Sequence, residues 1–244
     1  MPVTRWLAVG GGFILAGMTS ALPTTPQELW SELDDPWREA FRQGWEAFRT
    51  GNIPVGACAS TPDGVIVHAA RNRVTDRNAP PGEVFGSALA HAEANVLARL
   101  PYRHTGRLVL TTTLEPCIQC SAAIRLGPVA TVRYAGADPL WDGCHDFSPL
   151  SPREAARPAK VTMAGPRRDD IGVFATLMSR LGPGLVRGAA AEWLRASGQG
   201  VLLDLALHLQ ESGEALRLAA MEVDAAFEYL WPRLRSLRDA QVPG

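Results

Sequence analysis

The sequence predicts an α/β fold in which helices cover a central sheet, followed by a helical extension. Strand-like and helix-like segments alternate between residues 28 and 150, and apolar residues recur at helical spacing through most of residues 151–244. The chain has 244 residues, a net charge of −1 and 46% hydrophobic residues, a composition typical of globular proteins. We therefore expect a layered domain over residues 28–150 and a mostly helical extension over residues 151–244.

The first 27 residues are expected to be a flexible leader or the result of a start codon assigned too early. Their apolar run, residues 6–18, is too short to span a bilayer, and the single Arg5 before it is a weak basic region for an export signal, which is the alternative. Four cysteines in the whole chain are far fewer than in disulfide-stapled secreted proteins. We expect a cytoplasmic protein with no membrane partner.

The layered domain begins with a helix and a hairpin. Large apolar residues at spacings of three and four predict helix over residues 26–51, interrupted where Asp35 is expected to be an N-cap. Residues 55–60 and 65–70 are short runs of small and β-branched residues, which predict two strands. The Thr-Pro-Asp-Gly sequence at residues 61–64 is typical of a hairpin turn.

Further strands and helices alternate after a proline-containing loop over residues 72–87. We expect helices over residues 88–100 and 117–126, and strands over residues 107–113, 131–135 and 160–164. The longest C-terminal apolar stripe, residues 216–234, predicts a helix that is broken near Pro232.

Two short motifs bring together residues suited to metal chemistry. His91-Ala92-Glu93 lies near the start of one predicted helix, and Cys117 and Cys120 open another. One imidazole and two thiolates suit zinc, and three protein ligands leave the fourth tetrahedral position open for water. Glu93 is too close in sequence to His91 for both to chelate the same ion. We therefore predict zinc held by His91, Cys117 and Cys120, with Glu93 as the proton shuttle.

These residues form the H-x-E and P-C-x-x-C signature of zinc-dependent nucleobase deaminases. The chain resembles the cytidine and deoxycytidylate deaminase-like superfamily, and within it the branch of tRNA adenosine, guanine and nucleoside deaminases. The resemblance covers about residues 36–145 and includes three further segments in the family's order: Asn52–Ala57, Arg71–Val74 and Thr113–Cys117. It implies a three-layer α/β/α deaminase fold with a central mixed sheet, and a homodimer.

The resemblance also implies a reaction: an exocyclic amine of a base is replaced by a carbonyl, with release of ammonia. Zinc would lower the pKa of its water toward ~7, and Glu93 would carry the proton to the base and to the departing amine. Backbone groups at Ala57 and Cys117 would hold the substrate, and Asn72 would hydrogen-bond the base or ribose.

The substrate stays open because the chain departs from the branch in one place. Residues 78–87 look like an insertion at the mouth of the site, where a tRNA loop would have to enter, and they supply Asn78 as a rival to Asn72. We therefore expect a small-molecule purine or pyrimidine substrate. The alternative is a tRNA-specific adenosine deaminase, in which arginines would bind phosphates; the candidates are Arg71, Arg73, Arg77, Arg99, Arg103 and Arg107.

A second alternative is a non-catalytic, zinc-stabilised interaction module. A closed structural zinc site needs a fourth ligand, for which Cys58 and Cys144 are the candidates, and it does not need Glu93.

Overall fold

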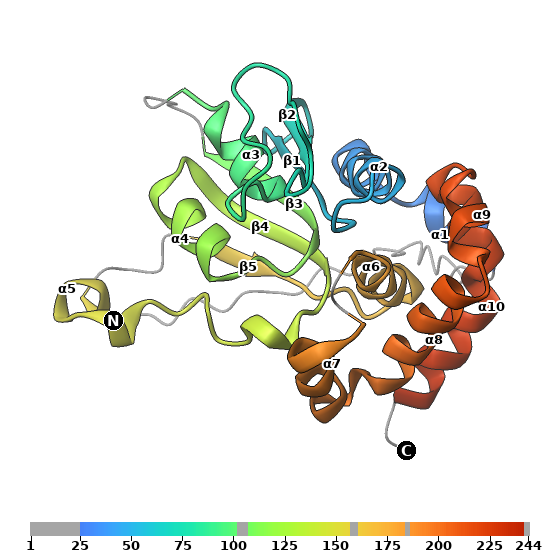
Figure 1. Cartoon of the computed structure of the whole chain (residues 1–244). Coiled ribbons are helices and arrows are strands. Elements are labelled where there is room, and N and C mark those ends of the chain that lie inside the picture. Colours follow the sequence, from blue (N-terminus) through green and yellow to red (C-terminus); the bar gives the residue numbers. More distant parts are fainter. Residues whose placement is uncertain (1–24, 102–106, 157–160, 184–185, 242–244) are drawn as a thin grey trace, which may run out of the picture.

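The computed structural model describes residues 25–101, 107–156, 161–183 and 186–241. Residues 1–24 of the expected leader lie outside the described residues. The described chain forms a central sheet with helices on both faces and further helices stacked beyond one of them (Figure 1).

The sheet has five strands in the order β2-β1-β3-β4-β5. Antiparallel pairing joins β2, β1 and β3, whereas β3, β4 and β5 are parallel to one another, so the sheet is mixed as expected. Short β-branched or small-residue runs form each strand, and the turn after Ser60 closes the predicted hairpin. The strands are β1 (Gly56–Ser60), β2 (Ile66–Arg71), β3 (Leu108–Leu114), β4 (Val129–Gly136) and β5 (Thr162–Ala164).

Helices α3 (Ala92–Ala98) and α4 (Ile118–Leu126) cover one face of the sheet, and α2 (Asp35–Arg49) and α6 (Asp170–Arg180) cover the other (Figure 1). The first pair packs on the sheet through one apolar cluster, in which Val96, Ile124 and Leu110 are buried. This cluster holds the two helices that carry the predicted zinc ligands. The expected three-layer α/β/α arrangement is therefore confirmed.

The C-terminal helices form a further layer over α2 and α6. Large buried residues such as Trp45, Phe174 and Phe227 join these elements in a second apolar cluster. The elements of this region are α1 (Pro26–Ser31), α7 (Gly188–Leu194), α8 (Gly200–Glu211), α9 (Glu214–Ala219) and α10 (Val223–Gln241). The predicted helical C-terminal region is present, and it also supplies β5 and α6 to the layered unit.

Three expected boundaries are corrected. The N-cap of α2 is Asp34, whose side chain accepts a hydrogen bond from the Trp37 amide at 3.1 Å, so Asp35 lies inside the helix. Helix α3 begins at Ala92 because the preceding backbone is used in turns: the His91 amide donates to the Leu89 carbonyl. The 216–234 stripe forms two helices that separate after Ala219, and Pro232 lies inside the second.

Candidate metal centre

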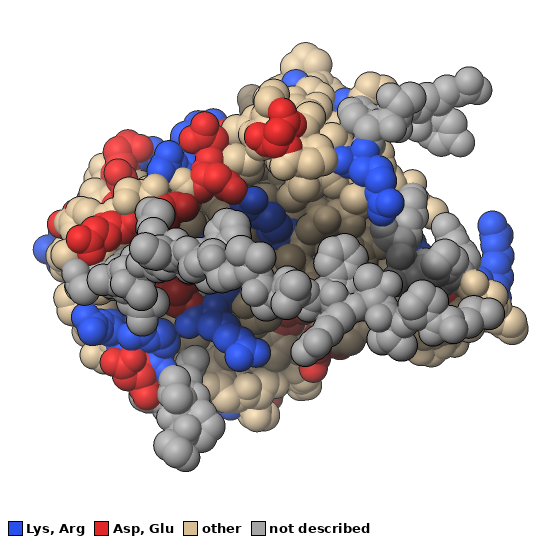
Figure 2. All heavy atoms as spheres, turned by 180° about the vertical axis from the view of Figure 1, so that it is seen from behind, with Lys and Arg blue, Asp and Glu red and all other residues tan. Residues whose placement is uncertain are grey.

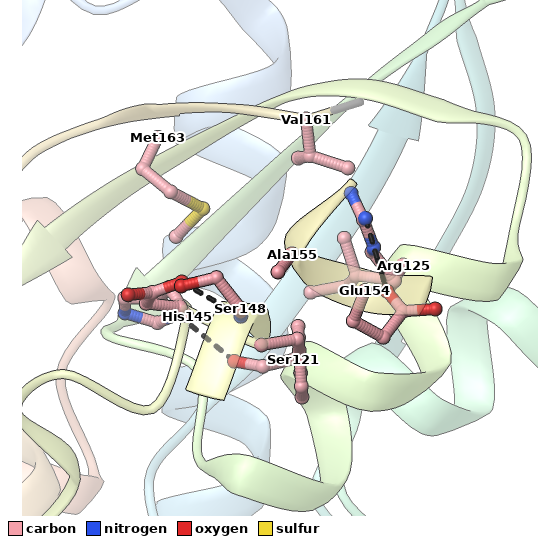
Figure 3. A pocket seen from close by; sticks show the side chains of 11 residues that line it. Ser121, Arg125, His145, Ser148, Glu154, Ala155, Val161 and Met163 are labelled. Atoms are coloured by element: carbon pink, nitrogen blue, oxygen red, sulfur yellow. Dashed lines mark hydrogen bonds and ion pairs between the residues drawn. The ribbon is translucent and has the colours of Figure 1, made fainter. Parts of the chain in front are cut away.

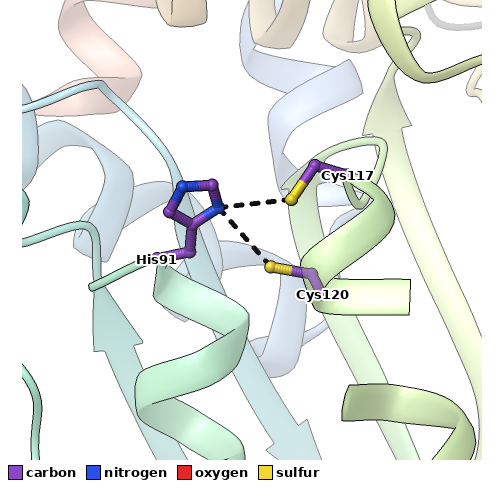
Figure 4. A group of neighbouring side chains, drawn as sticks. All are labelled: His91, Cys117 and Cys120. Carbon is purple, nitrogen blue, oxygen red and sulfur yellow. Dashed lines mark hydrogen bonds between the residues drawn. The ribbon is translucent and has the colours of Figure 1, made fainter. Parts of the chain in front are cut away.

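The two helix N-termini on the same face of the sheet bring the predicted ligands together. His91 is the N-cap residue of α3 and Cys117 is the N-cap residue of α4, and Cys120 lies in the first turn of α4. His91 Nδ1 lies 3.4 Å from Cys117 Sγ and 3.5 Å from Cys120 Sγ (Figure 4). Neither His91 nor Cys117 caps its own helix through its side chain, so both side chains are free to face each other.

The donor set fits zinc in its chemistry. One ligand atom from each of the three residues lies within 4.8 Å of the others, the spacing that a single ion can bridge. A hydrogen bond from Cys120, opposed by burial and aided by His91, lowers the pKa of the Cys117 thiol to about 4. The hydrogen bond with Cys117 raises the pKa of His91. A thiolate at a helix N-terminus is therefore available at neutral pH.

Glu93 lies beside this group but is not part of it. Its Oε2 is 3.5 Å from Cys120 Sγ, and its Oε1 accepts a hydrogen bond from Thr112 Oγ1 at 3.1 Å. Both Glu93 and Thr112 are buried. Burial raises the pKa of the Glu93 carboxyl above its ordinary value, against the opposing effects of the His91 charge and the Thr112 hydrogen bond. The site thus holds a carboxyl group that can carry a proton next to the zinc ligands.

The predicted substrate-side residues Asn72 and Ala57 belong to the end of β2 and to β1, the two strands that α3 contacts most. Asn72 follows β2 directly and is buried; its Oδ1 accepts a hydrogen bond from the Val74 amide at 3.1 Å. Within the described part of the chain, Asn72 Nδ2 donates to no other residue, which leaves an amide donor for a ligand. Ala57 in β1 pairs with Thr112 in β3, and Thr112 is the residue whose hydroxyl holds Glu93. Asn78, the rival to Asn72, is an exposed loop residue.

The 78–87 insertion is fixed to the domain by buried polar contacts. Asn95, on α3, accepts a hydrogen bond from the Val84 amide at 2.7 Å and donates to the Val84 carbonyl at 3.1 Å. Glu83, whose side chain is 3% exposed, forms ion pairs with Arg73 and Arg99. These contacts attach the insertion to α3, the helix that carries Glu93 and follows His91.

Arginines that were candidates for phosphate binding are largely used within the protein. Arg71 and Arg73 both form ion pairs with Asp76, at 2.7 and 2.8 Å. Burial raises the pKa of Asp76, but hydrogen bonds from Arg71, Asn52 and Arg73 outweigh it and lower that pKa below its ordinary value. Arg99 forms an ion pair with the carboxylate of Glu83 in the insertion. Arg77 is exposed, and Arg103 lies outside the described residues.

A fourth protein ligand is absent from the described residues. His91, Cys117 and Cys120 are the only cluster of His, Cys, Asp or Glu there that could hold an ion. Cys58 is buried within β1, and burial, with a smaller contribution from nearby carboxylates, raises the pKa of its thiol to about 12. Cys144 does not belong to the cluster. The arrangement leaves the fourth position of a tetrahedral ion open, as catalytic rather than structural zinc requires.

Sequence reasoning did not find Thr112 and Asn95. Thr112 lies in an apolar and threonine-rich strand, where a hydroxyl gives no signal of its own. Asn95 does leave a signal: it is a polar residue four positions after His91 in a short helix, and so lies on the same side of that helix as the ligand. A buried amide in such a place needs hydrogen-bond partners, which here come from the insertion.

The site geometry agrees with a comparison against protein families. Residues 32–135 match the family model of the cytidine and deoxycytidylate deaminase zinc-binding region. The chain belongs to this deaminase superfamily. The same match, together with the ligand group formed by His91, Cys117 and Cys120, confirms the expected zinc cofactor.

Curated relatives of this deaminase include enzymes of tRNA modification. It is 33% identical over 108 residues to the tRNA-specific adenosine deaminase of Aquifex aeolicus, an alignment that covers 43% of this chain and 66% of that protein. It is 26% identical over 129 residues to the tRNA-specific adenosine deaminase 2 of Xenopus laevis, covering 49% of this chain and 69% of that protein. The deaminase thus spans about two thirds of the length of these relatives.

Solved structures with a related arrangement include guanine deaminase from Nitrosomonas europaea, at 19% identity and a TM-score of 0.42, covering 61% of this chain and 84% of that one. A structure from a study of A-to-I editing by tRNA:A34 deaminases has 26% identity and a TM-score of 0.40, covering 52% and 94%. In the described part of this deaminase, no helix is long and apolar enough to cross a membrane.

Proposed function

We propose that this deaminase hydrolyses an exocyclic amine on a nucleobase, nucleoside or related small molecule, forming a carbonyl and ammonia. The observation that carries the proposal is the buried Glu93 carboxyl beside a His/Cys/Cys group with no fourth protein ligand among the described residues. A structural zinc site would need a fourth protein ligand, and it would not need a carboxyl group beside the ligands. The same observation therefore counts against a non-catalytic zinc-stabilised module.

In the proposed mechanism, His91, Cys117 and Cys120 would hold zinc, which would supply Lewis-acid activation of water. Glu93 accepts a proton from the attacking water, delivers it to a ring nitrogen of the base, and later protonates the amine, which leaves as ammonia. One water is consumed and one ammonia is released. The Thr112 hydroxyl holds one carboxyl oxygen of Glu93, which orients the other toward the ligand group.

We propose that Asn72 binds the substrate through its Nδ2 amide. The Asn72 side chain is already oriented, because its Oδ1 accepts from the Val74 amide, so little rotamer entropy is lost when the amide donates to a ligand. Backbone groups at Ala57 and Cys117 are proposed to complete the substrate contacts. Asn78 is exposed on the insertion and serves as the comparison residue.

Two features favour a small molecule over RNA. The 78–87 insertion, held by Asn95 and by the ion pair of Glu83 with Arg73, is proposed to form a fixed wall that restricts the approach to the site. Three arginines of the predicted phosphate-binding rim are already paired with carboxylates. On the left of Figure 2, which shows the molecule from behind, acidic and basic side chains lie among one another. RNA binding depends on unpaired positive charge.

The second candidate is a tRNA adenosine deaminase, which the curated relatives favour. Arg77 is exposed and has no partner among the residues that the structure describes, so it remains available to a phosphate. The family match does not separate the two candidates. It includes residues 107–114 and 117–126, on either side of the loop that leads into the cysteines, whichever substrate is used.

A panel assay separates these candidates. We would measure ammonia release from free bases, nucleosides, nucleotides and an anticodon stem-loop by zinc-loaded protein, with Asn72→Ala and Asn78→Ala as matched variants. The proposal expects release from a small molecule, with a higher KM for Asn72→Ala and an unchanged KM for Asn78→Ala. Release from the stem-loop alone would establish the second candidate, and zinc binding without any release would favour the interaction module.

We propose that residues 28–150 form the catalytic domain, that residues 151–244 extend it, and that the protein acts as a homodimer in the cytoplasm. Because β5 and α6 belong to the sheet and its covering layer, the extension is proposed to be part of the same folded unit.

A further inference from the structure

His145 forms a bridge between two segments on either side of the zinc-binding thiols. Its Nε2 lies 2.9 Å from Glu115 Oε1, and its Nδ1 lies 2.9 Å from Ser121 Oγ. The His145 side chain is 19% exposed and that of Glu115 is 11% exposed, so both contacts are largely shielded from water. His145 comes from the loop that follows β4, far from both partners in sequence.

The two partners enclose the thiol-bearing turn. Glu115 lies two residues before Cys117, and Ser121 follows Cys120 directly. Ser121 is joined to the first thiol residue by its amide, which donates to the Cys117 carbonyl at 2.8 Å. The Glu115 amide donates to the Gly136 carbonyl, and its Oε2 accepts from the Asp138 amide. Glu115 is thus attached to the end of β4 and the residues after it, and Ser121 is attached to His145 in the loop that follows.

We propose that His145 is a positioning residue that fixes the distance between the Cys117 and Cys120 thiols and so raises zinc affinity. The ring contacts neither thiol; it acts through Glu115 and Ser121, as residues behind metal ligands commonly do. Without this bridge, the loop after β3 and the first turn of α4 are joined by the contacts of Ser121 with Pro116 and Cys117, and Glu115 is no longer joined to Ser121. The proposal depends on the zinc site alone, and holds whether or not a base is deaminated.

A cavity of about 250 Å³ makes the bridge accessible from one side. His145 and Ser121 lie on its wall with apolar residues such as Ile124 and Met163 (Figure 3). Ser121, His145 and Glu115 have the residue types of a nucleophilic triad, but Ser121 is 4% exposed and its Oγ also lies 3.3 Å from the Pro116 carbonyl. Its hydroxyl therefore serves the fold of the turn, in agreement with a positioning role.

Zinc affinity of full-length protein, measured by competition with a chelator, tests the proposal. His145→Ala removes both contacts and is expected to weaken zinc binding by roughly 10- to 100-fold, the usual effect of losing a residue behind a metal ligand. His145→Gln keeps a donor near the Nε2 position, toward Glu115, and His145→Asn keeps a polar atom near the Nδ1 position, toward Ser121. Each is expected to restore part of the affinity.

The control is Ser148→Ala, in the same loop and the same cavity wall, where the amide and the side chain of Ser148 both hydrogen-bond Asp146. This variant is expected to bind zinc as the unaltered protein does. Cobalt(II) replaces zinc in a second measurement, since its visible absorption reports the geometry of the two thiolates, and His145→Ala is expected to change that spectrum. A folded His145→Ala protein with unaltered zinc affinity and cobalt spectrum would overturn the proposal. If His145→Ala does not fold, the Gln and Asn variants decide, because each loses a different one of the two contacts. A zinc affinity equal to that of Ser148→Ala in both variants would overturn the proposal.

Discussion

Replacing Asn95 with alanine tests whether the 78–87 insertion is a fixed wall of the site. The Asn95 side chain is fully buried and makes three hydrogen bonds: with the Val84 amide at 2.7 Å, the Val84 carbonyl at 3.1 Å and the Arg71 carbonyl at 3.4 Å. The substitution removes all three. The ion pairs of Glu83 and the hydrogen bond from the Gly86 amide to the Arg73 carbonyl remain, so the insertion loses part of its attachment.

The expected effect follows from the number of bonds. Two of these bonds hold the insertion, and each neutral hydrogen bond contributes about 1 kcal/mol net, so the free energy of opening the insertion should fall by roughly 2 kcal/mol. Exchange of the Val84 amide with solvent depends on this opening, and about 1.4 kcal/mol corresponds to a factor of ten, which predicts exchange roughly 30-fold faster. Amide hydrogen exchange followed by mass spectrometry or NMR measures it directly.

Asn78→Ala provides the matched control, since it makes the same substitution at an exposed asparagine of the same insertion. It should leave the Val84 exchange rate unchanged. If Asn95→Ala also leaves that rate unchanged, the insertion is not held by Asn95 and the argument that a fixed wall excludes RNA loses its basis.

Three further predictions concern buried polar groups. Thr112→Val removes the hydrogen bond to Glu93 and should lower kcat roughly tenfold or more at equal zinc content, since a bond to a charged group contributes about 1.5–3 kcal/mol; an unchanged kcat would contradict this. Arg180→Leu leaves the buried Asp138 without its counter-charge and should lower the free energy of unfolding in urea by about 3–5 kcal/mol, whereas a loss below about 1 kcal/mol would refute the importance of this pair. Asp76 has a folded-state pKa below its ordinary value of 3.8, so its contribution to stability is present above about pH 4 and is lost as the pH falls through the folded pKa; Asp76→Asn should flatten the stability profile in that range, and an equally steep profile would show that other groups cause it.

The grouping of His91, Cys117 and Cys120 could be predicted because its signal is local. One imidazole and two thiols occur at fixed spacings, and helix periodicity places both thiols on one side of α4. Strand positions followed from short runs of small or β-branched residues, and they were correct to within one or two residues for β1 and β3. Helix α3 was predicted to begin four residues too early because alanine and leucine favour helix, whereas the backbone before His91 forms turns with the insertion.

The contacts that support the site could not be predicted, since they join residues distant in sequence. His145 meets Glu115 and Ser121 only after β4 has brought its following loop back beside α4. The separation after Ala219 likewise depends on packing: the Trp45 indole and the Arg49 guanidinium both donate to the Met221 carbonyl, which fixes the chain between α9 and α10. Neither set of contacts leaves a periodic spacing of residues in the sequence from which it could be predicted.

The central claim is that Glu93 moves protons at a zinc site which it does not help to form. Its most direct test compares wild-type protein and Glu93→Gln, each loaded with zinc and assayed for bound metal and for ammonia release from the substrate found in the panel. The account predicts equal zinc content and a rate reduced by roughly 10²- to 10⁴-fold in the variant, the usual contribution of a general acid–base. Loss of zinc from the variant, or ammonia release at the wild-type rate, would contradict it.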